Sequence, residues 1–142
     1  MIYNLFDQNP EDELFGVCEE LKVGVIARVP LDEGSLGGKM TRASTFPEGD
    51  WRKGYFNPKN LSETMDRVDR LRAELPEGMG LPELAIRFIL SQPAVSTIIV
   101  GMRKPEHVRG NLALSDAGGL DAGLIETMRK HRWERHPVPW SD

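Results

Sequence analysis

Two continuous apolar runs, at residues 23–29 and 95–100, constrain the fold most strongly. Each run lies between segments with apolar residues at helical spacing, and a short apolar run in that setting is typical of a parallel strand buried on both faces. A third strand is predicted at Ile2–Phe6. Because strands that alternate with helices pair in parallel through right-handed crossovers, the fold class is predicted to be α/β.

Helices are predicted between and after these strands. They lie at about residues 10–22, 60–75, 81–92, 105–114 and 122–132. Asn9 is the expected N-cap of the first helix and Asp121 that of the last. The first helix has an apolar stripe formed by Leu14, Val17, Cys18 and Leu21. The C-terminal segment 133–142 contains two prolines and is predicted to be irregular.

Residues 30–60 form the longest predicted irregular stretch, and they are rich in glycine and proline. Loops of this length inside a domain are usually functional lids or disordered. The chain is expected to form a single domain over residues 1–142. Three strands are too few to close a barrel, which needs about eight. The arrangement is therefore expected to be part of a larger α/β structure.

Composition excludes several classes of protein. The formal net charge of −4 argues against a nucleic-acid binder that relies on phosphate contacts. No run approaches the roughly 20 apolar residues of a membrane span, and the N-terminal residues lack the regions of a signal peptide. The single cysteine, Cys18, excludes an internal disulfide, and His131 and His136 lack metal-ligand spacing. We expect a cytoplasmic protein with no metal and no nucleic-acid or membrane partner.

The second apolar run ends in a pattern that favours anion binding. Gly101 breaks the strand, Arg103 and a lysine follow it, and Pro105 begins the next helix. A strand that ends in glycine and cations before a helix N-terminus is a plausible anion site. His107 and Asn111 are four residues apart and share one face of that helix. An ordinary solvated helix face explains the same residues, and composition alone does not separate the two interpretations.

The first apolar run leads into a glycine-rich loop, residues 30–39. Its glycines allow close approach of the backbone to a phosphate, and Lys39 could neutralise it. Asp32 and Glu33 would repel a phosphate unless they point away, and a mobile surface loop is the alternative. Arg28 lies inside the strand, where a buried arginine requires either a carboxylate or a ligand.

Three stretches together resemble the aldo-keto reductases, in the C-terminal part of their fold. IYNLFDQ, at residues 2–8, is similar to the sixth barrel strand of that family. VGVIARVPLDEGSLGGK, at 23–39, is similar to the seventh strand and its pyrophosphate loop. LPELAIRFILSQPAVSTIIVGMRKPEHVRGNL, at 81–112, is similar to a helix, the eighth strand and the segment that binds the adenosine phosphate.

The resemblance implies a partial (β/α)8 TIM barrel with about three parallel strands, flanking helices and NADP(H) as its cofactor. Residues 30–60 would be a lid over the cofactor site. Arg28 would border the nicotinamide, with Val29, Pro30 and Leu31 along the pyrophosphate and Lys39 at a phosphate. The adenosine 2′-phosphate and adenine would lie against Gly101, Arg103, His107 and Asn111.

No catalytic residue is assigned. The family's catalytic tyrosine, aspartate, lysine and histidine come from early strands that have no counterpart in this sequence. The chain is therefore expected to be an NADP(H)-binding portion of a carbonyl reductase that is inactive alone. The alternative is a self-assembled half-barrel oligomer that acts as a non-catalytic nucleotide-binding or structural module. The expected protein partner is an N-terminal half or a second copy, bound through exposed sheet edges.

Overall fold

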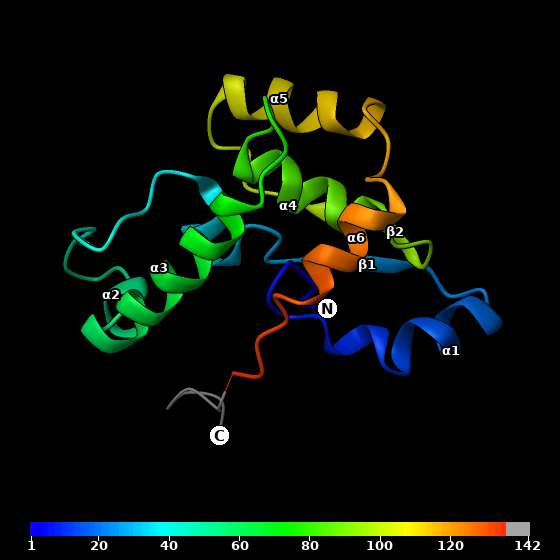
Figure 1. Ribbon diagram of the computed structural model, residues 1–142, viewed down its shortest axis with the longest axis horizontal. Helices are drawn as coiled ribbons and strands as arrows, with labels where there is room; N and C mark the ends of the chain where they lie inside the picture. The colour runs from blue at the N-terminus through cyan, green and yellow to red at the C-terminus, as the bar shows by residue number, and fades with distance from the viewer. Residues whose placement is uncertain (136–142) are drawn as a thin grey trace.

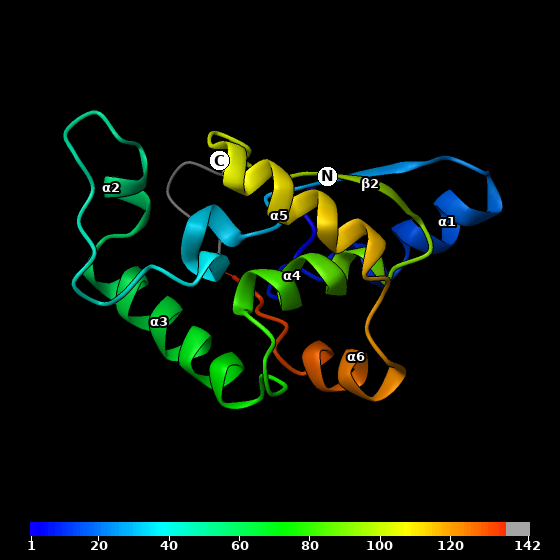
Figure 2. The ribbon, with the colours of Figure 1, turned by 90° about the horizontal axis from the view of Figure 1, so that it is seen from above.

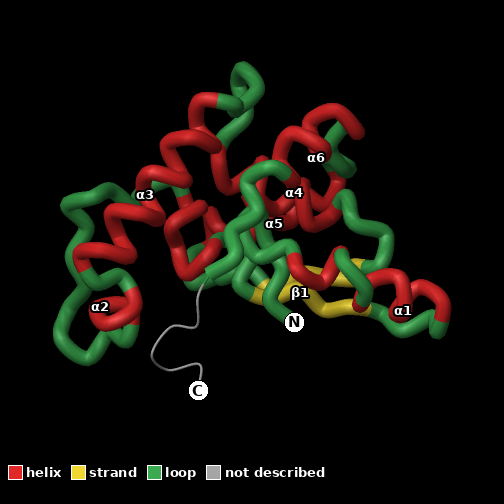
Figure 3. The backbone as a smooth tube through the Cα atoms, turned by 60° about the horizontal axis from the view of Figure 1, so that its bottom comes forward, coloured by secondary structure: helices red, strands yellow, loops and turns green. Residues whose placement is uncertain are grey.

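The computed structural model describes residues 1–135, and its sheet consists of two parallel strands. β1 (Val25–Arg28) pairs with β2 (Val95–Ile99), and Arg28 lies opposite Ile99 (Figure 3). The segment between the strands contains long helices, as a parallel crossover requires. The fold is α/β, as predicted.

The described part of the chain also contains six α-helices and two 3₁₀ helices. These are η1 (Asn9–Glu11), α1 (Leu14–Glu20), η2 (Asp32–Gly37), α2 (Arg52–Tyr55), α3 (Pro58–Ala73), α4 (Leu81–Leu90), α5 (Pro105–Asp116) and α6 (Ala122–Arg129). Figures 1 and 2 show α5 alongside α4, with α2 and α3 at one end of the molecule and α1 at the other. Within residues 1–135, none of these helices is long and apolar enough to cross a membrane.

Local signals explain where the longer helices begin. The Asn57 side chain accepts hydrogen bonds from the backbone N–H groups of Lys59 and Asn60, and Pro58 occupies the first turn of α3. Asp121 caps α6, as predicted, because its Oδ1 accepts a hydrogen bond from the Leu124 N–H at 3.0 Å.

The core lies between α3, α4 and one face of the sheet. The apolar stripes of the two helices are buried there, namely Leu61, Met65, Val68 and Leu71 of α3 and Leu84, Ala85, Phe88 and Ile89 of α4. Tyr3 joins the N-terminal segment to this core, since its ring centroid lies 4.8 Å from that of Phe15 and 5.7 Å from that of Phe88.

The predicted strand at Ile2–Phe6 is wrong beyond its first residue. Ile2 forms a single parallel bridge with Arg28, and the chain then turns away from β1. Asn4 causes this turn, because its side-chain oxygen accepts hydrogen bonds from the N–H groups of Phe6 and Asp7 at 2.9 and 3.0 Å. An asparagine that binds nearby backbone in this way competes with strand pairing.

The predicted helix at residues 10–22 is divided into η1 and α1. Asn9 does not cap it; Gln8 precedes η1 and makes no side-chain capping hydrogen bond. The apolar stripe also faces a different way from the prediction. Phe15 is the buried residue of α1, whereas Leu14, Val17 and Leu21 are exposed.

Neither strand is buried on both faces, which corrects a second prediction. Val25 and Ala27 are buried, but Ile26 is 52% exposed and Ile99 of β2 is 61% exposed. Helices cover one face of the sheet only. The side chains of β1 alternate between buried and exposed, and Ser96, Thr97 and Ile99 of β2 are exposed.

Residues 30–60 are less irregular than predicted, because η2 and α2 lie within them. Tyr55 and Phe56 are buried, and the Phe46 and Phe56 rings stack with centroids 5.4 Å apart. The stacking orders the segment internally, and Tyr55 and Phe56 attach it to the domain because both belong to the hydrophobic core. Residues 133–135 belong to no helix or strand, as predicted, and the rest of the predicted irregular tail, with His136, lies outside the described residues.

Candidate functional site

The pairing of β1 with β2 places the loops that follow them at the same edge of the sheet. The strands run parallel, and Arg28 at the end of β1 is level with Ile99 at the end of β2. Ligands of open α/β sheets bind beyond the carboxyl ends of the strands. The predicted residues that follow β1 and those that follow β2 therefore share one edge.

The loop after β1 has an unusual backbone. Val29, Asp32 and Glu33 have φ angles of 59°, 46° and 53°, in the left-handed region. For a β-branched residue such as Val29 this conformation is rare, and each such residue costs about 1–3 kcal/mol. Buried Asn4 holds the start of the loop, because its Nδ2 donates a hydrogen bond to the Val29 carbonyl at 3.0 Å.

Asp32 does not point toward the position predicted for a phosphate. Its side chain is 1% exposed and accepts a hydrogen bond from the Ser35 hydroxyl. The Arg135 guanidinium forms an ion pair with it and also donates a hydrogen bond to the Tyr55 hydroxyl. The charge of Asp32 is thus neutralised inside the protein, which removes the repulsion expected from Asp32 but not that expected from Glu33.

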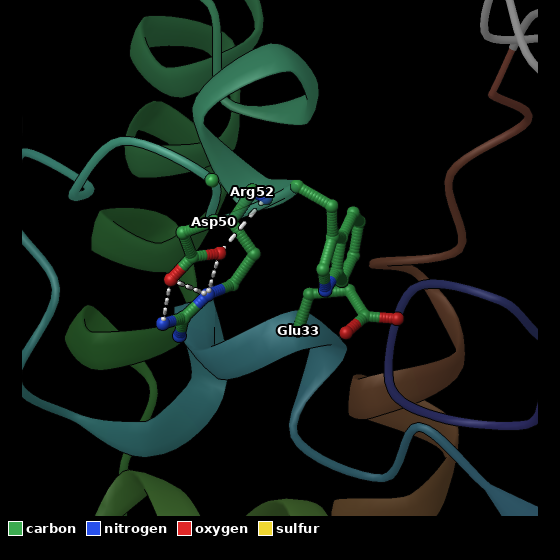
Figure 4. Close-up of a pocket in the computed structure, with 5 residues that line it drawn as sticks. Glu33, Asp50 and Arg52 are labelled. Carbon is green, nitrogen blue, oxygen red and sulfur yellow. Dashed lines mark hydrogen bonds and ion pairs between the residues drawn. The ribbon is translucent and has the colours of Figure 1, made fainter.

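Glu33 faces a different environment. It lines an open pocket of about 630 Å³ together with Gly49, Asp50, Trp51 and Arg52 (Figure 4). Arg52 is held by Asp50, with its Nη2 2.6 Å from Oδ2. Burial raises the pKa of Glu33, the charge of Asp32 raises it further, and Arg28 and Arg52 oppose both effects. The pocket therefore joins η2 to residues 49–52, and both lie within the segment 30–60 that was predicted as a lid.

The predicted residues of the β1 loop have different exposures. Arg28 and Lys39 are exposed, so Arg28 is not the buried arginine that the apolar run suggested. It lies on the uncovered face of the sheet. Pro30 is buried and Leu31 packs against the core, so these two residues offer a ligand their backbone rather than their side chains.

The residues after β2 surround a shallow depression of about 390 Å³. Met102, Arg103, Lys104, Pro105, Val108 and Arg109 line it. Within residues 1–135, Arg103 and Arg109 have no ion-pair partner, and Lys104 lies 3.9 Å from Glu106. The depression is at the N-terminus of the 12-residue helix α5, where the helix dipole also favours an anion.

The structure brings some of the predicted residues together. Asn111 donates a hydrogen bond from Nδ2 to the Gly101 carbonyl at 3.4 Å, which connects α5 to the loop after β2. His107 is exposed on α5 but does not line the depression. Arg109 does line it and is absent from the prediction, although its place four residues after Pro105 would have indicated it. Among residues 1–135, no group of three or more His, Cys, Asp and Glu side chains could hold a metal ion.

The model of the Aldo/keto reductase family matches residues 1–132. The chain belongs to this family. The resemblance predicted from the three sequence stretches is confirmed at that level, while the assignment to one half of the barrel stays a prediction.

Relatives with known sequences are longer than this chain. An uncharacterized oxidoreductase, YqkF, of Bacillus subtilis is 30% identical over 92% of this chain and 41% of its own length. The NADH-specific methylglyoxal reductase of Escherichia coli is 30% identical over 89% of this chain and 40% of its own length. The chain thus spans about two fifths of the length of these relatives.

The chain also matches less than half of the length of similar solved structures. Aldo-keto reductase AKR11C1 from Bacillus halodurans is 27% identical with a TM-score of 0.68, over 100% of this chain and 45% of its own. The glycerol dehydrogenase AKR11B4 from Gluconobacter oxydans is 26% identical with a TM-score of 0.76, over 98% of this chain and 43% of its own. The α/β fold of this family member is therefore similar to that of aldo-keto reductase structures.

The pKa of Tyr55 provides a test of the contacts among Asp32, Arg135 and Tyr55. Burial and the charge of Asp32 raise its pKa to about 12 from 10.0. The folded state therefore keeps the phenolic proton after the unfolded state has lost it. We expect this contribution to stability to be complete below about pH 10 and to be lost as the pH rises to about 12.

Urea unfolding across this pH range, followed together with tyrosinate absorbance, checks the expectation. Tyr55→Phe should reduce the loss of stability between these pH values without abolishing it, because burial and the hydrogen bond to Glu11 raise the pKa of Tyr3 as well. A variant that loses stability with the same slope as the wild type would show that Tyr55 is not the group responsible.

Proposed function

We propose that this chain is the NADP(H)-binding, C-terminal portion of an aldo-keto reductase barrel. The observation that carries the proposal is the depression at the N-terminus of α5, where Arg103, Lys104 and Arg109 gather. Three cations beside a helix N-terminus fit a phosphate group. Each guanidinium can bind two of its oxygens, and the N-terminal end of the helix dipole is also positive. Gly101, His107 and Asn111 would contact the adenosine next to it.

The loop after β1 fits the other end of such a nucleotide. The backbone of Val29, Pro30 and Leu31 would lie along the pyrophosphate, with Lys39 at a phosphate. Arg28 is exposed on the uncovered sheet face and would border the nicotinamide. Bound NADPH supplies a hydride, and these residues would hold and orient the cofactor.

The choice between NADPH and NADH depends on the 2′-phosphate. One relative is described as an NADH-specific methylglyoxal reductase, so membership of the family does not by itself decide between the two cofactors. A 2′-phosphate adds negative charge. The guanidinium of Arg103, which has no ion-pair partner among the described residues, is the group that would distinguish it from a hydroxyl.

Replacement of Arg103 tests the phosphate role. We expect Arg103→Ala to raise the Kd for NADPH about tenfold, because a charge-assisted bidentate contact is lost, and to change the Kd for NADH little. Fluorescence titration of the reduced nicotinamide measures both. Arg70→Ala, which removes an exposed arginine of α3, is the control for net charge. If Arg103→Ala weakened the binding of NADPH and NADH equally, or of neither, Arg103 would not be part of the proposed phosphate site.

The chain alone is expected not to reduce carbonyl compounds. The resemblance places the family's catalytic side chains on strands with no counterpart among residues 1–135. An assay of aldehyde-dependent NADPH oxidation with the purified chain, calibrated with a complete aldo-keto reductase, checks this. Turnover that saturates with aldehyde would contradict the expectation.

A second candidate is the self-assembled half-barrel, and the uncovered sheet face favours it. Ile2 bridges Arg28, which lies opposite Ile99, so these side chains share one face with Ile26. The three isoleucines are 40%, 61% and 52% exposed in that order. An N-terminal half of the same barrel or a second copy of this chain would remove this apolar surface from water.

Self-assembly predicts a dimer in solution. Light scattering coupled to size exclusion should then give twice the chain mass, and Ile99→Asp should return the monomer because it places a charge in the interface. Leu112→Asp, at a similarly exposed leucine of α5, is the matched control. A wild-type chain that is monomeric and unfolds cooperatively would exclude the half-barrel dimer.

A further inference from the structure

We infer that Arg135 is a positioning residue for the loop after β1, which it holds in one conformation from the C-terminal side of the described chain. This inference rests on the proposed function, in which the loop after β1 binds the cofactor; the part of that loop before Lys39, residues 29–38, is called the cofactor loop below. The segment that carries Arg135, residues 133–135, is called the C-terminal arm below.

Aromatic packing fixes the C-terminal arm. Trp133 is buried, and its backbone N–H donates a hydrogen bond to the Phe6 carbonyl at 2.9 Å. The guanidinium carbons of Arg67 and Arg135 lie 4.2 and 4.4 Å from the centroid of the Trp133 ring. These contacts hold Arg135 in place with its side chain only 16% exposed.

The guanidinium of Arg135 connects three separate segments. It forms an ion pair with Asp32 of η2, and its Nη2 is 3.8 Å from Oδ2 of Asp7, after the N-terminal turn. It also donates a hydrogen bond to the hydroxyl of Tyr55 in α2. One cation thus faces two carboxylates, and Asp32, whose side chain is 1% exposed, depends on it. Removing one member of such a buried pair leaves an uncompensated charge.

The contact with Asp32 acts on the strained part of the cofactor loop. Asp32 has a left-handed φ of 46°, and Val29, three residues earlier, has one of 59°. Asn4 holds the Val29 carbonyl and Arg135 holds the Asp32 carboxylate, so the strained residues are fixed at both ends. A strained conformation persists only where its surroundings determine it.

Order in this loop bears directly on nucleotide affinity. A loop that is already in its bound conformation loses less conformational entropy when a ligand binds. Arg135 is not placed to touch a nucleotide, since its two Nη groups face Asp32, Asp7 and Tyr55, and its Nε is buried with no hydrogen-bond partner among residues 1–135. Its effect on binding therefore passes through the loop.

The test compares Arg135→Gln with Arg132→Gln. Arg132 directly precedes the C-terminal arm and forms ion pairs with Asp12 at 2.6 and 2.7 Å and with Glu134 of the arm at 2.6 Å, so its variant controls for the loss of a charge and of an ion pair to the arm. Hydrogen exchange of the free protein should rise at residues 29–38 in Arg135→Gln only. The Kd for NADPH should rise about fivefold or more in that variant and stay unchanged in the control.

A double variant separates the ion pair from simple loss of packing. Asp32→Asn combined with Arg135→Gln removes both charges of the pair and should restore part of the exchange protection, because the buried carboxylate of Asp32 is no longer left without its cation. If Arg135→Gln does not fold, Arg135→Lys replaces it. Lysine keeps the charge but cannot contact Asp32 and Tyr55 at the same time as the guanidinium does. Hydrogen exchange at residues 29–38 and the Kd for NADPH are therefore expected to rise in Arg135→Lys as well.

The outcomes distinguish this inference from the proposed function. Wild-type protein that shows no saturable NADPH binding would overturn the proposed function, and hydrogen exchange would then decide the role of Arg135 by itself. Exchange at residues 29–38 that is unchanged by Arg135→Gln would overturn the inference, even if NADPH binds to the wild type.

Discussion

The parallel pairing of β1 with β2 is the constraint on which the candidate site depends. It brings two loops that are distant in sequence to one edge, because Arg28 and Ile99 are level with each other. One loop has a strained backbone with exposed Lys39 at its end, and the other has cations beside a helix N-terminus. Neither loop would be more than a surface feature without the strand pairing that brings them together.

At this edge of the sheet, basic side chains are exposed and an acidic side chain is buried. Arg103 and Lys39 are exposed and point into solvent, where an incoming anion could reach them. Asp32, one of the two acids in the loop after β1, is buried and paired with Arg135, whereas Glu33 lines the open pocket beside Asp50 and Arg52. A chain with a net charge of −4 can thus present a positive surface locally, since one of the two carboxylates that would oppose it is turned inward.

The helices and their order were predictable from the sequence because their signals are local. Asp121 caps α6, Pro105 begins α5, and the spacing of Leu61, Met65 and Val68 forms the buried stripe of α3. The family also followed from short contiguous stretches. In the candidate site, the glycines and cations after each strand were visible for the same reason.

Contacts between distant residues left no comparable signal. Asn4 is part of an apolar run that favours a strand, and only its hydrogen bonds to the turn at residues 6–7 explain why the strand ends. The pairing of Asp32 with Arg135 joins residues with no spacing pattern between them. The exposure of Ile26 and Ile99 was equally hidden, since an apolar run does not reveal how many layers cover the sheet.

The uncovered face of the sheet has an electrostatic consequence for Arg28. This arginine shares that face with Ile26 and Ile99, so at present its charge is screened by water. A partner that covered the isoleucines would lower the dielectric constant around the guanidinium. The attraction between two unit charges about 4 Å apart grows roughly fourfold when the effective dielectric constant falls from that of water to about 20. The strength with which Arg28 attracts an anion is therefore set by what covers the neighbouring side chains as well as by its own position.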